Sequence, residues 1–381
     1  MIHSTRILIA LAAAAAASAL SAQTVSVPGI GNAVSVQEDQ LGIPTIKASS
    51  ENDVAFAQGY LHGRDRFFQM DAARRQASGT LAELVGESVL SDDIQLRTLG
   101  LRRAAWATYS RLDSDTRGWL QAYANGVNTW LRTNPLPPEY GALELTAAEP
   151  WSPVDSLVIA KALAFQLSFD LDIDLTIKAQ AYQMAGEVGG FDGSALFAAD
   201  THRIAPIDDR VTVPGFLAGI GGVPMVPTST GVSPQSGGGA GKSPAPQAAA
   251  ALGTIAERTA TLAERYRDKI EDVPILRRTL NQRDGRGGSN EWAVSGEHTA
   301  SGRPLVANDP HLGLDLPPVF TEEQLIVTGG DGFEVSGVAV PGTPGIIQGC
   351  NQHLCWGTTT HPMDVTETYE ETLRVNSLGL P

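Results

Sequence analysis

Apolar residues at helical spacing dominate the first half of this 381-residue chain. Ser50 can cap a helix in which Asp53 completes a capping box, and the helical pattern continues to about Arg75. A second helix is expected over residues 115–131, where aromatic and aliphatic residues recur every three or four positions. A third begins at Ser152, followed by a proline in the first turn, where a missing N–H costs nothing. The first half is therefore predicted to be mostly helical.

Strand patterns occur before the first helix and again near the end of the chain. Residues 25–47 alternate between apolar and polar positions, with a glycine and a proline as punctuation. The late part of the chain predicts further strands, over residues 290–295, 304–308, 323–328 and 333–340. A glycine-rich turn joins the last two of these as a hairpin, and residues 346–358 predict another. The last hundred residues are therefore predicted to be rich in strands.

A stretch of low complexity separates the two halves. Residues 215–253 are mainly Gly, Pro, Ser and Ala, which cannot bury enough apolar surface to repay the entropy of ordering. We expect a linker or spacer here, followed by an amphipathic helix within residues 255–273. The predicted segments are residues 1–22, a helical region 23–214, the linker 215–253, a helix and cleavage segment 254–288, and a strand-rich region 289–381.

The first 22 residues are typical of an export signal. A short positive segment precedes the apolar, alanine-rich run Ile7–Leu20, and small residues follow near Ser21. The run is shorter than the roughly 18–20 apolar residues that a membrane anchor needs. A formal net charge of −15 argues against nucleic acid and anionic membrane as partners, since both select for clustered Lys and Arg. We expect a periplasmic or secreted bacterial protein that is free of the membrane once its signal is removed.

Two cysteines, Cys350 and Cys355, occur late in the chain. An oxidising compartment permits a disulfide between them across the predicted hairpin tip, and two buried thiols explain them equally well. A zinc site is not expected, because no second Cys or His pair supplies four ligands.

The segment Gly287-Gly288-Ser289-Asn290-Glu291-Trp292 offers an unusual nucleophile. Cleavage of the Gly288–Ser289 bond would give Ser289 a free α-amine beside its own hydroxyl. Such an amine has a pKa near about 7.7–8.0, so a useful fraction is neutral and can accept the hydroxyl proton. From these six residues alone, an ordinary glycine loop before a strand is the better explanation. The motifs around them reverse that preference.

Several spaced motifs accompany Ser289. Downstream stand Ala307-Asn308-Asp309-Pro310-His311-Leu312, Pro341-Gly342-Thr343-Pro344-Gly345, Trp356-Gly357-Thr358-Thr359 and Asp364-Val365-Thr366-Glu367-Thr368-Tyr369, and upstream stand Gly59–Asp71 and Gly79–Leu84. In this order they make the chain resemble the penicillin acylase family of N-terminal-nucleophile hydrolases, over residues 25–381 without the linker. The resemblance implies an α+β fold, namely part of a four-layer αββα sandwich with a mainly helical α-chain region.

The resemblance implies a precursor that cuts itself before Ser289 into α and β chains that stay associated. Glycine at 287 and 288 permits backbone conformations closed to other residues, so strain can be stored at the Gly288 carbonyl that Ser289 attacks. In turnover, Ser289 Oγ is expected to attack a substrate amide and form an acyl-enzyme, with its own amine acting as base through a water molecule. No organic cofactor is expected. The implied oxyanion donor is the backbone N–H of Thr360. His311 is implied to orient the nucleophile or the amine, and a solvent-facing loop histidine is the alternative.

A structural calcium ion is also implied. Asp364, Thr366 through its carbonyl, and Glu367 match the β-chain part of the family's calcium site, and oxygen ligands suit this hard cation. A carboxylate from the α-chain should join them, and Asp174 is the first choice with Asp172 as the alternate. The alternative explanation is that Asp170, Asp172 and Asp174 form a solvated, alternating face.

The expected substrate is a small-molecule N-acyl compound, such as a β-lactam with an acyl side chain. N-acyl-homoserine lactones and lipopeptides are alternatives within the family. Leu167, Phe169 and Phe320 are candidates for an apolar acyl pocket, and ordinary core packing explains them equally well. A catalytically inert secreted binding or scaffold protein, or a non-functional fragment, is the alternative of another class. Because the family's β-chain continues beyond residue 381 and supplies a further oxyanion donor, we expect a longer gene.

Overall fold

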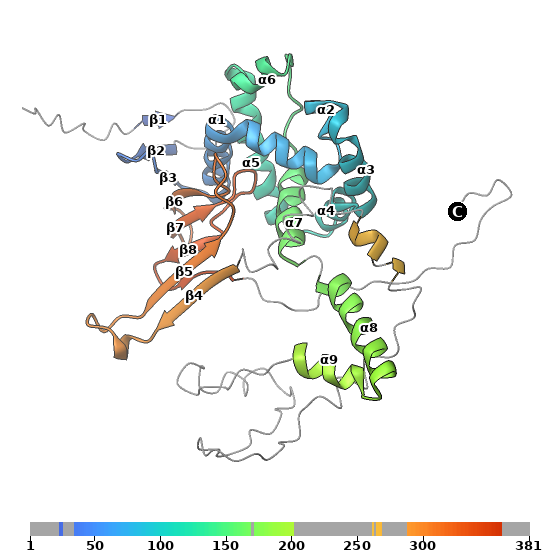
Figure 1. Ribbon diagram of the computed structural model, residues 1–381. Coiled ribbons are helices and arrows are strands. Elements are labelled where there is room, and N and C mark those ends of the chain that lie inside the picture. Colours follow the sequence, from blue (N-terminus) through green and yellow to red (C-terminus); the bar gives the residue numbers. More distant parts are fainter. Residues whose placement is uncertain are drawn as a thin grey trace, which may run out of the picture. The chain divides into compact units, whose positions relative to one another are not determined.

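The computed structural model describes residues 23–25, 34–168, 171–201, 261–262, 264–268 and 288–359. The described residues fall into two units (Figure 1). The first unit contains the described residues up to 168 together with residues 288–359. The second contains helices α8 (Leu171–Gly189) and α9 (Gly193–Thr201), which pack against each other.

A seven-stranded sheet forms one side of the first unit, in the order β1-β2-β3-β6-β7-β8-β9. Its strands are β1 (Gln23–Val25), β2 (Val34–Glu38), β3 (Pro44–Ala48), β6 (Thr321–Val327), β7 (Phe333–Ala339), β8 (Gln348–Asn351) and β9 (Cys355–Trp356). Neighbours are antiparallel except β3 and β6, which run parallel with Thr45 opposite Gln324. This parallel pair joins the N-terminal region to the strand-rich region, although about 280 residues separate the two strands in sequence.

The predicted hairpins are present in this sheet. Strands β2 and β3 are joined by a turn in which Asp39 Oδ1 accepts hydrogen bonds from the main chain of Leu41 and Ile43. Strands β6 and β7 pair antiparallel around the glycine-rich turn, as predicted. Strands β8 and β9 are joined by a disulfide between Cys350 and Cys355. The structure therefore contains the disulfide and excludes the alternative of two buried thiols.

Helices pack on the sheet and form the helical part of the first unit (Figure 1). They are α1 (Glu51–Ser78), α2 (Ala82–Val85), α3 (Leu90–Leu99), α4 (Leu101–Tyr109), α5 (Ser114–Thr133), α6 (Pro138–Ala142) and α7 (Pro153–Ser168). The predicted start of α1 is confirmed, because Ser50 Oγ accepts from the main-chain N–H of Asp53. The predicted start of α7 is confirmed as well, since the Asp155 carboxylate accepts from the N–H of Ser152 at 2.7 Å. None of the helices within the described residues combines the length and apolar character needed to cross a bilayer.

Helix α1 has two apolar contacts along its length. Its first half packs on the sheet, where Val54 and Leu61 meet Ile46 and Leu325. It also packs against α5: Phe56 in its first half lies close to Gly126, and Phe67 and Met70 in its second half meet a buried group that includes Tyr123, Val127 and Trp130. Both groups are almost fully buried, so α1 connects the sheet to the helical layer through two parts of the core.

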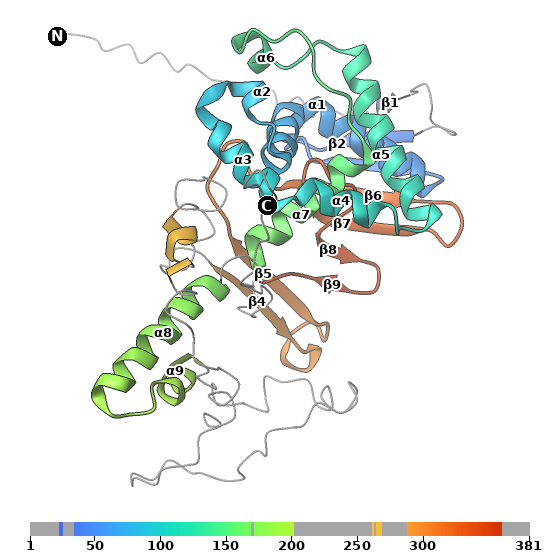
Figure 2. The ribbon, with the colours of Figure 1, turned by 90° about the vertical axis from the view of Figure 1, so that its right-hand side faces the viewer.

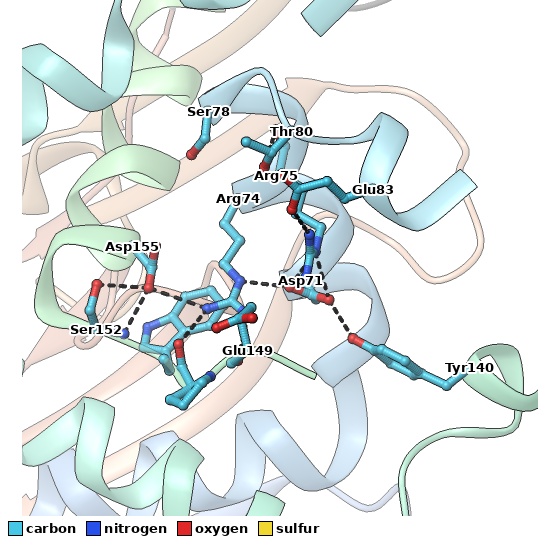
Figure 3. A network of polar contacts seen from close by, with 12 residues as sticks. Asp71, Arg74, Arg75, Ser78, Thr80, Glu83, Tyr140, Glu149, Ser152 and Asp155 are labelled. Atoms are coloured by element: carbon cyan, nitrogen blue, oxygen red, sulfur yellow. Dashed lines mark hydrogen bonds and ion pairs between the residues drawn. The ribbon is translucent and has the colours of Figure 1, made fainter. Parts of the chain in front are cut away.

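A buried polar network ties α1 to α6 and α7 (Figure 3). Arg74 donates to Asp71 at 2.6 Å and to Asp155 at 3.2 Å, and the hydroxyl of Tyr140 donates to Asp71. Burial raises the pKa of Asp155, but the charge of Arg74 and the hydrogen bonds from Ser152 and Arg102 outweigh it and leave this pKa below its usual value. Burial and Asp71 raise the pKa of Tyr140. The network fixes the N-terminal end of α7, whose later turns line the candidate site.

Candidate active site

Strands β4 (Gly288–Val294) and β5 (Leu305–His311) form a separate antiparallel ribbon in the first unit. Residue pairs along the ribbon run from Gly288 opposite His311 to Val294 opposite Leu305. Both strands were predicted; β4 begins two residues before the predicted start and ends one residue earlier, and β5 begins one residue later and continues three residues beyond the predicted end. Because side chains alternate along a strand, Ser289 shares a face of the ribbon with its cross-strand partner Pro310 and with Leu312.

A cavity of about 470 Å³ opens beside Ser289. Its walls come from α7, from the ribbon, from the segment 340–348 and from Thr358 and Thr359. Helix α7 contributes Ile159, Ala160, Leu163 and Ala164, and Phe320 adds an aromatic side chain. Figure 2 shows α7 running toward the ribbon, in agreement with these shared wall residues. Ser289, a half-buried residue, therefore lies at the wall of a cavity lined mainly by aliphatic groups.

The side chain of His311 lies on the other face of the ribbon from Ser289. Its cross-strand partner is Gly288, and its Nε2 lies 3.1 Å from the Asn290 amide nitrogen and 3.3 Å from Asp309 Oδ2. Strand alternation puts these residues on one face and Ser289 on the opposite one. His311 is 43% exposed and is absent from the cavity wall. The structure therefore does not bring His311 together with the Ser289 hydroxyl, because the register of the ribbon turns it away.

The segment Gly357–Thr359 lies directly beside the start of β4. The Thr359 hydroxyl donates to the Ser289 carbonyl at 3.1 Å. Asn308 Nδ2 donates to the carbonyl of Thr358 at 3.0 Å, and the N–H of Thr358 donates back to Asn308 Oδ1 at 3.2 Å. The segment is thus held against both strands of the ribbon immediately before residue 360.

Buried polar side chains hold the loop 341–345, which forms another wall of the cavity. Gln58 Oε1 accepts from the N–H of Gly345 at 2.8 Å, and the Tyr123 hydroxyl accepts from the N–H of Gly342 at 2.9 Å. His62 is hydrogen-bonded to both Tyr123 and Glu323, and Gln58 donates to the same carboxylate at 3.0 Å. Burial, together with the charge of Glu323, holds the pKa of Tyr123 well above its usual value despite the hydrogen bond from Gly342, so this hydroxyl stays neutral.

The remaining predicted site residues are placed as follows. Gly288 begins β4, and Phe320 is one of the residues that line the cavity. Leu167 and Asp174 lie in α7 and α8, but their side chains are outside the described part of the structure. Outside the described residues altogether lie Phe169, Thr360, Asp364, Thr366 and Glu367.

The calcium site therefore stays a prediction. Within the described residues, no three His, Cys, Asp or Glu side chains come together in a way that could hold a metal ion. The residues expected to bind calcium lie beyond that part, or their side chains do. We derive no chemical step through a metal.

Three groups of site residues were not predicted from the sequence. The first is the face of α7 formed by Ile159, Ala160, Leu163 and Ala164, whose spacing of three and four is also that of an ordinary core helix. The second is Asn308, which belongs to a quoted motif but had no assigned role. The third is the pair Gln58 and His62, which hold the loop 341–345; two polar residues one turn apart among the apolar residues of α1 were the available signal for them.

Comparison with known proteins gives a consistent result. The profile of the family described as penicillin amidase matches residues 33–378. The penicillin acylase 2 proenzyme of Pseudomonas sp. strain SE83 is 30% identical over 350 residues, which are 91% of this chain and 39% of that protein. The acyl-homoserine lactone acylase QuiP of Pseudomonas aeruginosa is 29% identical over 349 residues, which are 91% of this chain and 35% of that protein. The chain thus spans less than half the length of these relatives.

A solved structure is also similar. A thermostable penicillin G acylase from Alcaligenes faecalis aligns with a TM-score of 0.40 and 27% identity, over 48% of this chain and 97% of that one.

Proposed function

This chain belongs to the penicillin amidase family, and on that basis we propose that it is the part of an amidohydrolase that carries the nucleophile. The proposed reaction is hydrolysis of an N-acyl amide to a carboxylic acid and an amine, through an acyl-enzyme on Ser289. The observation that carries the proposal is the position of Ser289, at the start of a strand and on the wall of an apolar cavity of about 470 Å³. The two glycines before it permit the backbone to bend at a scissile bond.

Maturation in this proposal is an attack within the chain. The Ser289 hydroxyl adds to the Gly288 carbonyl, the peptide nitrogen leaves as the new α-amine of Ser289, and water then hydrolyses the ester. The products are a carboxyl-terminal Gly288 and an amino-terminal Ser289. The amine that results stands on the same residue as the nucleophile and can serve as its base.

Turnover then uses the same hydroxyl. The α-amine accepts the proton of Ser289 Oγ as that oxygen bonds to the substrate carbonyl, and the proton passes to the departing amine nitrogen. Water attacks the acyl-serine ester, the acid leaves, and the hydroxyl is restored. The proposed donor to the transient oxyanion is the N–H of residue 360. No step is assigned to His311, because its side chain lies on the opposite face of the ribbon.

The cavity supports an apolar acyl group as the recognised part of the substrate. Its walls are mainly aliphatic, so each buried methylene of an acyl chain contributes about 0.8 kcal/mol, or roughly a fourfold gain in kcat/KM. A linear acyl chain, as in acyl-homoserine lactones, and a penicillin side chain both meet this requirement. We therefore propose both as candidate substrates, in line with the names of the two relatives.

The decisive experiment follows the fate of the Gly288–Ser289 bond in the complete gene product. Mass spectrometry should find a chain that begins Ser-Asn-Glu-Trp, and a series of acyl amides of increasing length should be hydrolysed with rising kcat/KM until the cavity is filled. Ser289→Ala should abolish both cleavage and hydrolysis, because it removes the attacking oxygen. Ser301→Ala, an exposed serine of the turn between β4 and β5, is the matched control.

Two results would contradict the proposal. An uncut chain that still hydrolyses amides would rule out the α-amine as base. A chain that is neither cut nor active on any acyl amide would favour the inert binding or scaffold protein. We further propose export to the periplasm or cell exterior, and for the complete protein the four-layer αββα sandwich with its α and β chains associated.

A further inference from the structure

The side chain of Asn308 is hydrogen-bonded to three main-chain groups, one in strand β4 and two in the segment Gly357–Thr359. Its Nδ2 donates to the Asn290 carbonyl in β4 at 3.1 Å and to the Thr358 carbonyl at 3.0 Å. Its Oδ1 accepts from the Thr358 N–H at 3.2 Å. Asn308 stands two residues before Pro310 on β5, so it shares the face of the ribbon that carries Ser289.

This arrangement needs a carboxamide. The Asn308 amide pairs with both the N–H and the C=O of Thr358, as a neighbouring strand would, and uses its second N–H hydrogen on β4. An aspartate could accept from Thr358 but could donate to neither carbonyl, and an alanine could do neither.

The bridged segment passes very close to Asn308. A Cβ added to Gly357 would lie 2.6 Å from both Cβ and Cγ of Asn308, so only glycine fits there. Thr358 and Thr359 are themselves exposed, so hydrogen bonds rather than apolar burial hold them. On the far side Gln348 donates to the Thr358 hydroxyl, and the Thr359 hydroxyl donates to the Ser289 carbonyl.

We propose that Asn308 is a positioning residue that holds the segment Gly357–Thr359 against the strand carrying the nucleophile. It ties the segment Gly357–Thr359 to the strand that begins at Ser289, and the next N–H along that segment is the donor of the proposed function, on which this inference rests. Asn308 touches no reacting atom. Substituting Asn308 should leave the cavity walls formed by α7 and Phe320 unchanged. It removes the hydrogen bonds that hold the segment Gly357–Thr359 against β4.

The expected signature is a selective loss in the transition state. Misplacing a catalytic group by about 1 Å can cost about 100-fold in rate, and removing one oxyanion donor costs about 100- to 1,000-fold. Asn308→Ala should therefore lower kcat by roughly 10- to 100-fold and leave KM within about threefold. Asn308→Asp keeps the hydrogen bond from the Thr358 N–H, so its kcat should lie between those of the wild type and the alanine variant.

Inhibitors separate this role from a purely structural one. In an alkylboronic acid the Ser289 oxygen bonds to boron while its proton moves to the α-amine, which gives a tetrahedral adduct with an oxygen at the oxyanion position. The carboxylic acid with the same alkyl chain only fills the apolar cavity. Asn308→Ala should raise the inhibition constant of the boronic acid by the same factor by which it lowers kcat. The inhibition constant of the carboxylic acid should stay within about threefold of the wild-type value. Asn125→Ala, an exposed asparagine of α5, is the control and should match the wild type.

The test uses the complete gene product, with the amount of matured enzyme counted by the chain beginning at Ser289. Equal weakening of both inhibitors, or no change in either, would overturn the role of Asn308. If Asn308→Ala does not mature, Asn308→Asp and Gly357→Ala must show the selective loss, and their failure to do so would overturn it equally. A wild-type protein that hydrolyses no acyl amide and binds no boronic acid would instead refute the proposed function.

Discussion

Two glycines of helix α5 lead to opposite predictions for the same substitution. Gly126 faces α1, and a Cβ built on it would lie 1.9 Å from the carbonyl oxygen of Phe56 and 2.8 Å from the main-chain nitrogen of Tyr60. Gly118 lies in the same helix, and a Cβ there would meet nothing within 4 Å. Both substitutions change glycine to alanine within one helix, so the intrinsic helix propensity changes equally in both.

The magnitude follows from that geometry. Ordinary contact begins at 3.4 Å, and the obstacle to Gly126→Ala is main chain, which cannot turn aside as a side chain can. Helix α5 must therefore move away from α1 by more than about 1 Å, and a gap of 0.5–1 Å already forfeits roughly a quarter to a half of the dispersion energy across it. Overpacking of this kind costs about 1–3 kcal/mol or more, against a helix-propensity gain of about 1 kcal/mol. We expect Gly126→Ala to destabilise by about 2 kcal/mol and Gly118→Ala to stabilise by about 1 kcal/mol.

Thermal unfolding measures this difference. Both substitutions are made in the Ser289→Ala background, so that maturation does not vary, and the midpoint is followed by circular dichroism. About 2 kcal/mol corresponds to a midpoint lower by about 4–8 °C, and about 1 kcal/mol to one higher by about 2–4 °C. A Gly126→Ala midpoint equal to or above that of Gly118→Ala would show that α1 and α5 do not pack as closely as the structure has them.

Two further predictions concern the buried polar groups. The folded pKa of Asp155 is lowered, so its contribution to stability is present above the unfolded pKa of about 3.9 and is lost as pH falls through the folded pKa. Asp155→Asn should therefore unfold at lower temperature than the wild type at pH 7, with a gap that narrows below about pH 4; a gap independent of pH would contradict this. Glu323→Gln removes the carboxylate shared by Gln58 and His62 and should loosen loop 341–345. KM for long acyl amides should then rise by about tenfold, whereas an unchanged KM would separate this network from the cavity.

Much of the local structure of this chain could be predicted from short stretches of sequence. The starts of α1 and α7 could be predicted because a capping serine and an aspartate three residues later form hydrogen bonds with each other's side chain or main chain. The hairpins β6–β7 and β8–β9 could be predicted because two strands joined by a short turn pair with each other. The order of the spaced motifs was enough to indicate the family, and the family profile confirms it.

The composition of the site, in contrast, was decided by tertiary structure. Strand alternation could not assign His311 a face relative to Ser289 until the pairing of β4 with β5 fixed the register, and that register turns His311 away. The wall formed by Ile159 and Leu163 comes from a helix more than a hundred residues before Ser289, and helical periodicity does not say what a helix will face. Local hydrogen bonds and turns are determined over a few residues, so sequence alone specifies them. The cavity and the contacts of Asn308 are formed by segments that meet only after the chain has folded. Which residues form them therefore depends on the tertiary packing.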